Sequence, residues 1–197
     1  MYTSTDKSSA KERILNATLD IISKEGFNKV TVRKIAVAAD VNIAAVNYYF
    51  GSKDCAINEA LKKAIVKIEH SFIYLKDENL HPRQRLENFM NDYINAALAY
   101  HDIVRNFIGN TIINCPIKDE YTLFLKNEAL ILLKNTLRLL LPNKDKKDLD
   151  FIAFQLMSSL IFPVIAKGVP CKIMDIDFYD DSIRKSYIDT FLNNISS

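Results

Sequence analysis

Side chains that could contact a nucleic acid are concentrated in one short stretch, NIAAVNYYF at residues 42–50. Val46 and Phe50 lie four residues apart, a spacing that suits two apolar anchors on one side of a short helix. The other side chains then face mostly outward: Ile43, Ala44, Asn47, Tyr48 and Tyr49. Small residues let a helix backbone enter the major groove, and Asn and Tyr can reach bases or phosphates. The stretch therefore predicts a recognition helix for DNA.

Residue patterns typical of enzymes are missing from the sequence. His70, His81 and His101 are scattered, and neither a metalloprotease HExxH nor a GxSxG nucleophile motif occurs. With 4 Gly in the chain, a glycine-rich phosphate loop is nearly excluded. A Cys115–His101 pair assembled by the fold stays open as a remote enzymatic alternative. We expect a protein that is not an enzyme and that uses no cofactor.

The cysteines and the first residues bear on the cellular compartment. Cys55, Cys115 and Cys171 are far apart and include no CxxC pair, so we expect free thiols, no zinc or other metal site, and no disulfide framework. The opening MYTSTDKSSAKER lacks the apolar middle of a signal peptide, and no run approaches about eighteen apolar residues. These features predict a cytoplasmic protein with no membrane partner.

Two further helices are predicted to hold the recognition helix. Thr31 is suited to cap a helix whose apolar face repeats at helical spacing through Ile35, Ala36 and Ala39. Asp40-Val41 breaks that pattern, and Asn42 can cap the recognition helix. Upstream, Ser9 to Glu12 is a capping-box signature before an apolar stripe that ends at Gly26. The sequence thus predicts a three-helix head.

Residues 31–53, TVRKIAVAADVNIAAVNYYFGSK, with the preceding KEGFNKVTV, resemble the heads of TetR/AcrR transcriptional regulators. Those heads typically read T-x-x-x-I-A-x-x-A-G-V-[SN]-x-x-x-[LIV]-Y-x-[YH]-F-x-[SN]-K. The matching positions are Thr31, Ile35, Ala36, Ala39, Val41, Asn42, Val46, Tyr49, Phe50, Ser52 and Lys53. Asp40 replaces the usual turn glycine, but Asp tolerates a left-handed conformation, so we expect the turn to survive. Asn47 replaces a tyrosine that generally contacts a phosphate, and we expect Tyr48 and Tyr49 to share that contact.

The resemblance implies a role for each residue of the head. Thr31 and Lys53 would hold phosphates, and Arg33 would project toward a base or phosphate. Tyr49 would lie on the DNA backbone, while the capping Asn42 and the groove-facing residues complete the surface: Ile43, Ala44, Ala45, Asn47 and Tyr48. In the family, a homodimer binds a palindromic operator, most often as a repressor. A small-molecule effector enters the body, and the fourth helix carries the change to the two heads.

Composition predicts an all-α protein of about nine helices, because only 4 Gly, 5 Pro and few alternating β-branched runs occur. A long helix should follow Ser52, then a polar loop at 76–82. Five more helices are expected at about 83–100, 103–114, 118–141, 149–167 and 179–195, with a loop at 142–148. Pro163 should kink or end the fourth of these. The predicted domains are a helix-turn-helix head at 1–51 and an effector-binding and dimerisation body at 52–197.

Aromatic and polar side chains of the body could line a small-molecule pocket, although an aromatic stripe at helical spacing is more often plain core. Polar members would fix the orientation of a ligand, because a buried polar group needs a partner. The aromatic richness favours an apolar or amphipathic effector. The candidates are Phe89, Tyr93, Tyr100, Phe107, Asn110, Tyr121, Phe124, Phe154, Gln155 and Met157.

The segment 149–167 is apolar nearly all round, which predicts burial on all faces and suggests that a second copy supplies part of the cover. A central helix of a monomer is the alternative. In the resembled family the last two helices form a four-helix bundle between subunits. The candidate interface residues are Ser158, Ser159, Phe162, Tyr187, Ile188 and Phe191.

The sequence-based interpretation is therefore an effector-responsive, homodimeric DNA-binding regulator. The net charge of +2 supports nucleic-acid binding only weakly, with 11 Lys and Arg against 8 Asp and Glu in residues 1–75. One alternative is a TetR-like DNA-binding protein that takes no ligand and acts through protein partners. The other is an enzyme on a helical scaffold.

Overall fold

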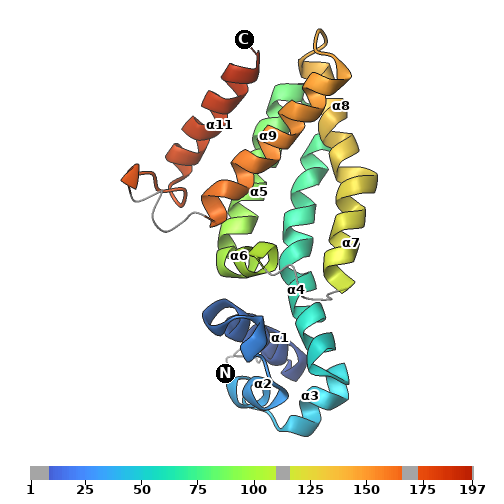
Figure 1. The fold of residues 1–197 in the computed structure, drawn as a ribbon, viewed down its shortest axis with the longest axis vertical. Coiled ribbons are helices and arrows are strands. Elements are labelled where there is room, and N and C mark those ends of the chain that lie inside the picture. The colour runs from blue at the N-terminus through green and yellow to red at the C-terminus, as the bar shows by residue number, and fades with distance from the viewer. Residues whose placement is uncertain (1–8, 110–115, 166–172, 197) are drawn as a thin grey trace, which may run out of the picture. The chain divides into compact units, whose positions relative to one another are not determined.

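The computed structural model describes residues 9–109, 116–165 and 173–196, and its regular elements are all helical (Figure 1). These residues divide into two compact units, one within Met1–Lys63 and Asn106–Ile117 and the other within Ala64–Arg105 and Lys118–Ser197. Three helices contribute residues to both units: α4 (Lys53–His70), α6 (His101–Gly109) and α7 (Pro116–Phe124). The prediction of an all-α fold is confirmed.

The first unit begins with α1 (Ala10–Glu25), which has the predicted capping box. The Ser9 hydroxyl accepts the Glu12 amide at 3.2 Å, and the Glu12 carboxylate accepts the Ser9 amide at 3.3 Å. These bonds satisfy two amides that the first turn of a helix leaves without helical partners. Gly26 ends α1 with φ of +86°, a backbone conformation that favours glycine. A 3-10 turn, η1 (Phe27–Lys29), follows, and Phe27 is buried.

Helices α2 (Val32–Ala38) and α3 (Ile43–Phe50) complete the head together with the first half of α4. Its core is apolar, and side chains from every helix are almost fully buried: Ile14, Ile22, Val30, Ile35, Val46 and Leu61. The Lys63 ammonium donates a 3.0 Å hydrogen bond to the Asn16 side-chain oxygen. The first compact unit includes α4 as far as Lys63, and the predicted domain boundary at residues 51 and 52 lies directly before α4.

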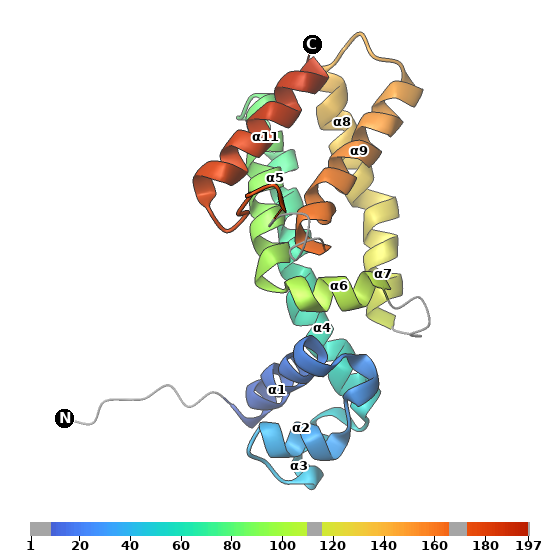
Figure 2. The same ribbon diagram turned by 60° about the vertical axis from the view of Figure 1, so that its left-hand side comes forward.

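The second unit is built around α5 (Pro82–Ala99), which packs against four other elements. These are the 3-10 segment η2 (Ser71–Lys76), α8 (Leu130–Leu140), α9 (Lys146–Ile165) and α11 (Asp181–Ser196) (Figures 1 and 2). The buried face of α5 supplies Leu86, Phe89, Met90, Ile94 and Ala97, all without exposed surface. Helix α7 (Pro116–Phe124) and a π turn, η3 (Leu125–Ala129), lead into α8.

Several predicted boundaries differ from the structure. The predicted helix 118–141 is interrupted by η3, so α7, η3 and α8 form one irregular rod (Figure 1). The structure extends α4 by the 3-10 segment η2. Helix α9 begins at Lys146 rather than 149, because the Asp145 carboxylate accepts the Asp148 amide at 2.8 Å. Pro163 lies inside α9 and does not end it. Residues 110–114 and 166–167 of two predicted helices lie outside the described residues.

Helix α9 is buried on one side only, contrary to the expectation of burial on all faces. Its inner face consists of Leu149, Ala153, Leu156, Leu160 and Val164. Its outer face exposes Phe151, Phe154 and Phe162 by 56%, 73% and 57%. By length and composition alone, α9 is the one helix in the described ranges that could cross a membrane, a test that core helices of soluble proteins also pass. The exposed rings instead indicate a face that lacks a partner within the second unit.

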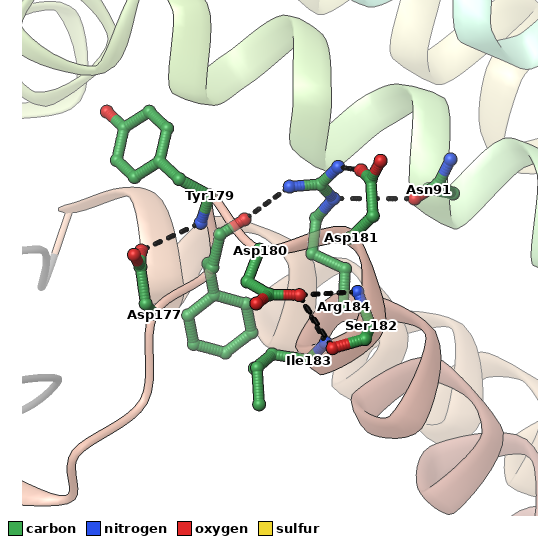
Figure 3. Close-up of polar contacts among 9 residues, drawn as sticks. Asn91, Asp177, Tyr179, Asp180, Asp181, Ser182, Ile183 and Arg184 are labelled. Carbon is green, nitrogen blue, oxygen red and sulfur yellow. Dashed lines mark hydrogen bonds and ion pairs between the residues drawn. The ribbon is translucent and has the colours of Figure 1, made fainter.

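A buried arginine fixes the start of α11 on α5 (Figure 3). Arg184 donates to the Phe178 carbonyl oxygen at 2.6 Å and to the Asn91 side-chain oxygen at 3.4 Å, and it forms an ion pair with Asp181. Beside it, the Asp180 carboxylate accepts the Ser182 amide at 2.7 Å and the Ser182 hydroxyl at 2.6 Å. These hydrogen bonds lower the pKa of Asp180 and cap α11.

Candidate nucleic-acid interface

Both helices of the predicted helix-turn-helix start with a side-chain cap, as predicted. The Thr31 hydroxyl oxygen accepts the Lys34 amide at 3.2 Å, and the Asn42 side-chain oxygen accepts the Ala45 amide at 2.7 Å. A hydroxyl that accepts one hydrogen bond still has its own proton to donate. Thr31, which is exposed, can therefore cap α2 and donate to a phosphate oxygen at the same time.

The turn between α2 and α3 has the left-handed backbone that was predicted for Asp40. Asp40 has φ of +52°, and the next amide, that of Val41, donates to the Ala36 carbonyl oxygen at 3.0 Å. Asp and Asn adopt this conformation more readily than other residues with a side chain. Asp40 can therefore form the same turn as the glycine that it replaces.

Arg13 of α1 also holds this turn, and the sequence analysis did not single it out. Its Nε donates to the carbonyl oxygen of Ala39, the C-terminal cap of α2, at 3.0 Å. A cation is favourable at the C-terminal end of a helix, where carbonyl groups lack helical partners. The two residues are 26 positions apart, so no local spacing in the sequence could have indicated this contact.

The outward face of α3 has the composition that was predicted for it. Val46 and Phe50 are buried, with 0% and 8% of their surface exposed, whereas Tyr48 is 84% exposed. Tyr49 packs edge-on against Tyr48, with ring centroids 5.2 Å apart. Ala45 is half-buried, and the remaining predicted groove residues are exposed: Asn42, Ile43, Ala44, Asn47 and Tyr49. The face is thus open to a partner and mixes small, amide and phenol side chains.

Two basic residues at the predicted phosphate positions are exposed. Arg33 lies on α2, and Lys53 is the first residue of α4. A helix N-terminus attracts anions because its first amides lack helical acceptors, and the Lys53 ammonium adds a full charge there. The Ser52 hydroxyl already accepts the Cys55 amide at 3.2 Å. The start of α4 can therefore hold a phosphate oxygen.

Part of the predicted effector pocket comes together as an aromatic cluster in the second unit. Phe72, which was not predicted, lies between the rings of Phe89 and Phe124, at centroid distances of 4.6 and 5.4 Å. Tyr93 is 5.8 Å from Phe89, and its hydroxyl lies 3.4 Å from that of Tyr121. Burial raises the pKa of both tyrosines above about 10, and the neighbouring Tyr121 raises that of Tyr93 further. The rings fill the cluster themselves.

Other predicted pocket residues are not part of this cluster. Phe154, at 73% exposure, and Gln155 are exposed on α9, because periodicity alone could not tell which side of an apolar helix faces inward. Tyr100 is half-buried, with the Lys67 ammonium 5.5 Å from its ring centroid, and Met157 packs at the edge of the core. The Phe107 side chain and Asn110 lie outside the described residues.

A groove of about 210 Å³, lined mainly by residues with polar side chains, lies between α5 and α11. Its lining residues are Glu87, Asn88, Asn91, Lys185, Ile188 and Asp189. Arg83 forms ion pairs with Glu87 at 2.8 Å and with Asp189 at 3.4 Å, so the acidic groups of the groove already have a cationic partner. None of the predicted pocket residues lines this groove.

The predicted interface residues occupy two different environments. Ser158 and Phe162 are exposed on α9, in line with Phe151 and Phe154. Ile188, by contrast, is 3% exposed and belongs to the core of the second unit, which excludes it from a surface contact. Phe191 is half-buried, and the Tyr187 hydroxyl donates to the Ser159 carbonyl oxygen at 2.8 Å, a bond that joins α11 to α9. Burial raises the pKa of Tyr187.

The first unit has the geometry of a helix-turn-helix, with both helices capped and the outer face of α3 exposed. The sequence profile of the bacterial regulatory proteins of the tetR family matches residues 14–57. The chain is 36% identical over 94 residues to the HTH-type transcriptional repressor KstR of Mycolicibacterium smegmatis, a region covering 48% of this chain and 46% of that protein. It is 30% identical over 93 residues to the HTH-type transcriptional regulator BetI of Stenotrophomonas maltophilia, covering 44% and 47%. The chain thus spans less than half the length of these curated relatives.

Solved structures extend the likeness of fold to nearly the whole chain. The TetR family transcriptional regulator PfmR of Thermus thermophilus has a TM-score of 0.70 at 17% identity, over 92% of this chain and 97% of that one. The fatty acid degradation regulator FadR of Bacillus halodurans has a TM-score of 0.69 at 16% identity, over 97% and 98%. At such identities the likeness concerns the fold alone. The profile match identifies a tetR-type DNA-binding head at residues 14–57, and the fold of nearly the whole chain is similar to that of TetR family regulators. The family is not one of enzymes, which agrees with the expectation from the sequence.

Proposed function

We propose that the chain binds a palindromic DNA operator through the exposed face of α3, as a homodimer, and that a small apolar or amphipathic effector releases it. The observation that carries DNA binding is the division of α3 into two sides. Val46 and Phe50 anchor the helix, while Asn47 and Tyr48 are presented outward. An exposed mixture of small, amide and phenol groups suits base edges and phosphates, and it offers little to an apolar core.

The homodimer is supported by the outer face of α9. Phe151, Phe154, Ser158 and Phe162 are spaced by three and four residues, so they form one line, which we call the α9 stripe. Three exposed phenylalanines in one line form an apolar surface that a second copy would cover. Ser158 at its middle would allow close helix approach. Two heads would then read both halves of an operator, with half-site centres about 34–36 Å apart.

The aromatic cluster around Phe72 is the proposed effector site. The Tyr93 and Tyr121 hydroxyls are polar groups in an otherwise apolar region, which is the usual make-up of a small-molecule site. Burial raises the pKa of both phenols, so they stay protonated well above neutral pH, and the Tyr93 hydroxyl would donate a hydrogen bond to an acceptor on the effector. This chemistry favours an effector with an aromatic or aliphatic body and one hydrogen-bond acceptor.

One observation favours the alternative of a regulator without a small-molecule ligand. The rings of Phe72, Phe89 and Tyr93 pack directly against each other, with centroids 4.6 to 6.0 Å apart. A site filled by its own side chains needs a rearrangement before it can accept an effector. A protein of that alternative class would hold its operator in the presence of any small molecule.

The deciding experiment is selection of bound fragments from a random DNA pool by the full chain, followed by a release screen with apolar compounds. Enrichment of an inverted repeat supports the proposal, and an effector that releases it supports the effector site. Recovery of DNA without any shared sequence would contradict the proposed operator. The double variant Asn47→Ala/Tyr48→Ala should no longer enrich the inverted repeat. Lys144→Ala, which changes a loop residue of the second unit, should still enrich it.

A further inference from the structure

Two irregular turns border the aromatic cluster in the second unit. η2 is a 3-10 segment of six residues, and η3 is a π turn in which the Leu130 amide donates to the Leu125 carbonyl oxygen, five residues back. Runs of 3-10 helix longer than about four residues are uncommon, and π turns are rare and frequently occur at functional sites. Their occurrence on neighbouring segments is therefore unusual for a plain helical scaffold.

Two side-chain contacts join the irregular turns. The Lys76 ammonium of η2 lies 2.5 Å from a carboxylate oxygen of Glu128 in η3. The Phe124 ring, directly before η3, meets the edge of the Phe72 ring of η2 at a centroid distance of 5.4 Å. Phe72 is 1% exposed and also contacts Phe89 and Tyr93. A change in either turn would therefore alter the cluster directly.

A π turn holds one more residue than an α turn, so closing it changes the register of the preceding helix. One residue of register corresponds to a rotation of about 100°. Suppose that α8 stays fixed and that η3 closes into an α-helix. The extra residue of the π turn then needs a helical position of its own, so each residue of α7 moves into the position of the residue before it. Leu125 then replaces Phe124 against Phe72, and Thr122 replaces Tyr121 beside Tyr93. Both exchanges bring a smaller side chain inward, so space opens in the cluster.

Helix α8 is the fixed partner in this change, and α7 is the part that can turn. Leu133 and Leu137 of α8 have no exposed surface and belong to the core. On α7, Leu123 is 56% exposed and Thr122 is exposed. The hydroxyl contact from Tyr121 to Tyr93 measures 3.4 Å, which is long for such a hydrogen bond. Leu125 already packs at the edge of the core, so its inward movement is short.

We propose that η3 is a register switch for the effector site: α7 alternates between the π register, with a filled cluster, and a continuous α-helix that opens the cluster. The inference rests on the proposed function, because it names how that same site would become accessible. An effector that binds only the open cluster would shift the equilibrium by its difference in affinity for the two registers.

The test uses the full chain with Phe124→Trp as the only tryptophan, since the natural chain has none. In the π register this ring lies against Phe72, and in the α register it takes the exposed place of Leu123. The probe is 1-anilinonaphthalene-8-sulfonate, an apolar anion. Saturating probe should increase acrylamide quenching of the tryptophan several-fold. Deletion of Asn127 in this background removes the extra residue of the turn and keeps α7 in its present orientation.

The deletion variant should keep its tryptophan buried and bind the probe about tenfold or more weakly. Asn127→Ala, which retains the chain length, should behave like its parent. Equal probe binding and equal quenching in the deletion variant would overturn the switch. Operator binding is measured without probe on the same proteins. A parent that binds no operator contradicts the proposed function, while the tryptophan signal still decides the switch.

Hydrogen exchange of the natural chain gives a second measurement that does not depend on how well the deletion variant folds. Amides of residues 119–129 should exchange about tenfold or more faster than those of residues 132–140, because a register change breaks and remakes their bonds without global unfolding. Exchange of both segments at the slow rate of the core would also overturn the switch.

Discussion

The Nε of Arg13 donates a 3.0 Å hydrogen bond to the carbonyl oxygen of Ala39, so α1 holds the last turn of α2 directly before the left-handed turn at Asp40. This bond constrains the angle at which α3 leaves α2. Arg13 is thereby a positioning residue for DNA recognition, although it lies outside the predicted DNA surface.

Arg13→Ala should weaken operator binding by about tenfold and leave the salt dependence unchanged, because the guanidinium positions α3 and neutralises no phosphate. It should also lower the free energy of unfolding by about 1–3 kcal/mol, since the Ala39 carbonyl loses its partner. Fluorescence anisotropy over a series of salt concentrations checks the first effect, and urea unfolding checks the second. A decrease of the salt slope by about one would instead indicate a direct phosphate contact.

Lys53→Ala and Arg33→Ala should affect DNA binding in different ways, the first through affinity for all DNA and the second through sequence preference. Removing the Lys53 charge at the start of α4 should weaken binding to all DNA alike and reduce the salt slope by about one. Removing Arg33 from α2 should relax sequence preference at one position of each half-site. Binding to a panel of single-base operator variants separates the two effects. If Lys53→Ala altered base preference and left the slope intact, the assigned roles would be wrong.

Asp40→Val should cost about 1–2 kcal/mol of stability, because a β-branched residue strongly disfavours φ of +52°. The free energy of unfolding of Asp40→Asn should lie within about 0.5 kcal/mol of that of the natural chain, since Asn tolerates the same conformation. Removing the Asp40 carboxylate should also strengthen DNA binding modestly if this turn approaches the phosphates. Urea unfolding of the two variants, measured side by side, makes the comparison. Equal stability of both would show that the turn is not left-handed in solution.

Phe154→Glu should convert the proposed dimer into a monomer, since it places a charge within the apolar α9 stripe. Ile131→Glu is the matched control, because it changes another exposed apolar residue, on α8. Sedimentation velocity or light scattering reports the mass. A Phe154→Glu protein that remains dimeric would exclude the stripe as the interface. Truncation before α11 is a poorer test, because it would expose the core around Ile188 and Leu192.

The buried tyrosine pair should make the second unit sensitive to alkaline pH. Burial raises the pKa of Tyr93 in the folded state, so above about pH 10 the unfolded chain loses this proton first. The free energy of unfolding is therefore unaffected by this proton below that pH, and it decreases as the pH rises further. Urea unfolding between pH 8 and 11 should show a smaller decline for Tyr93→Phe than for the natural chain. Tyr48→Phe, at an exposed site, should leave the decline unchanged.

Most of the head was predictable because its signals are local. Thr31 and Asn42 cap helices through amides three residues away, and Asp40 adopts the backbone that its residue type tolerates. The outward face of α3 followed from the spacing of Val46 and Phe50. Arg13 could not be found in this way, because its partner lies in another helix.

The second unit was less predictable because its decisive features are not local. An apolar stretch such as α9 does not reveal which side faces inward, so Phe154 and Gln155 were assigned to a pocket although they are exposed. Phe72 was missed because its role depends on rings from three other segments. The π turn LKNEA has the composition of an ordinary helix, so no local signal in the sequence marks the extra residue of this turn.

The outer phenylalanines of α9 also bear on gene dosage. If the DNA-competent species is a pair, then at low abundance its amount grows with the square of the subunit concentration, and so does promoter occupancy. A twofold change in the rate of synthesis would therefore change promoter occupancy about fourfold. Three solvent-facing rings on one helix would in this way give the regulator a steep threshold without any additional component.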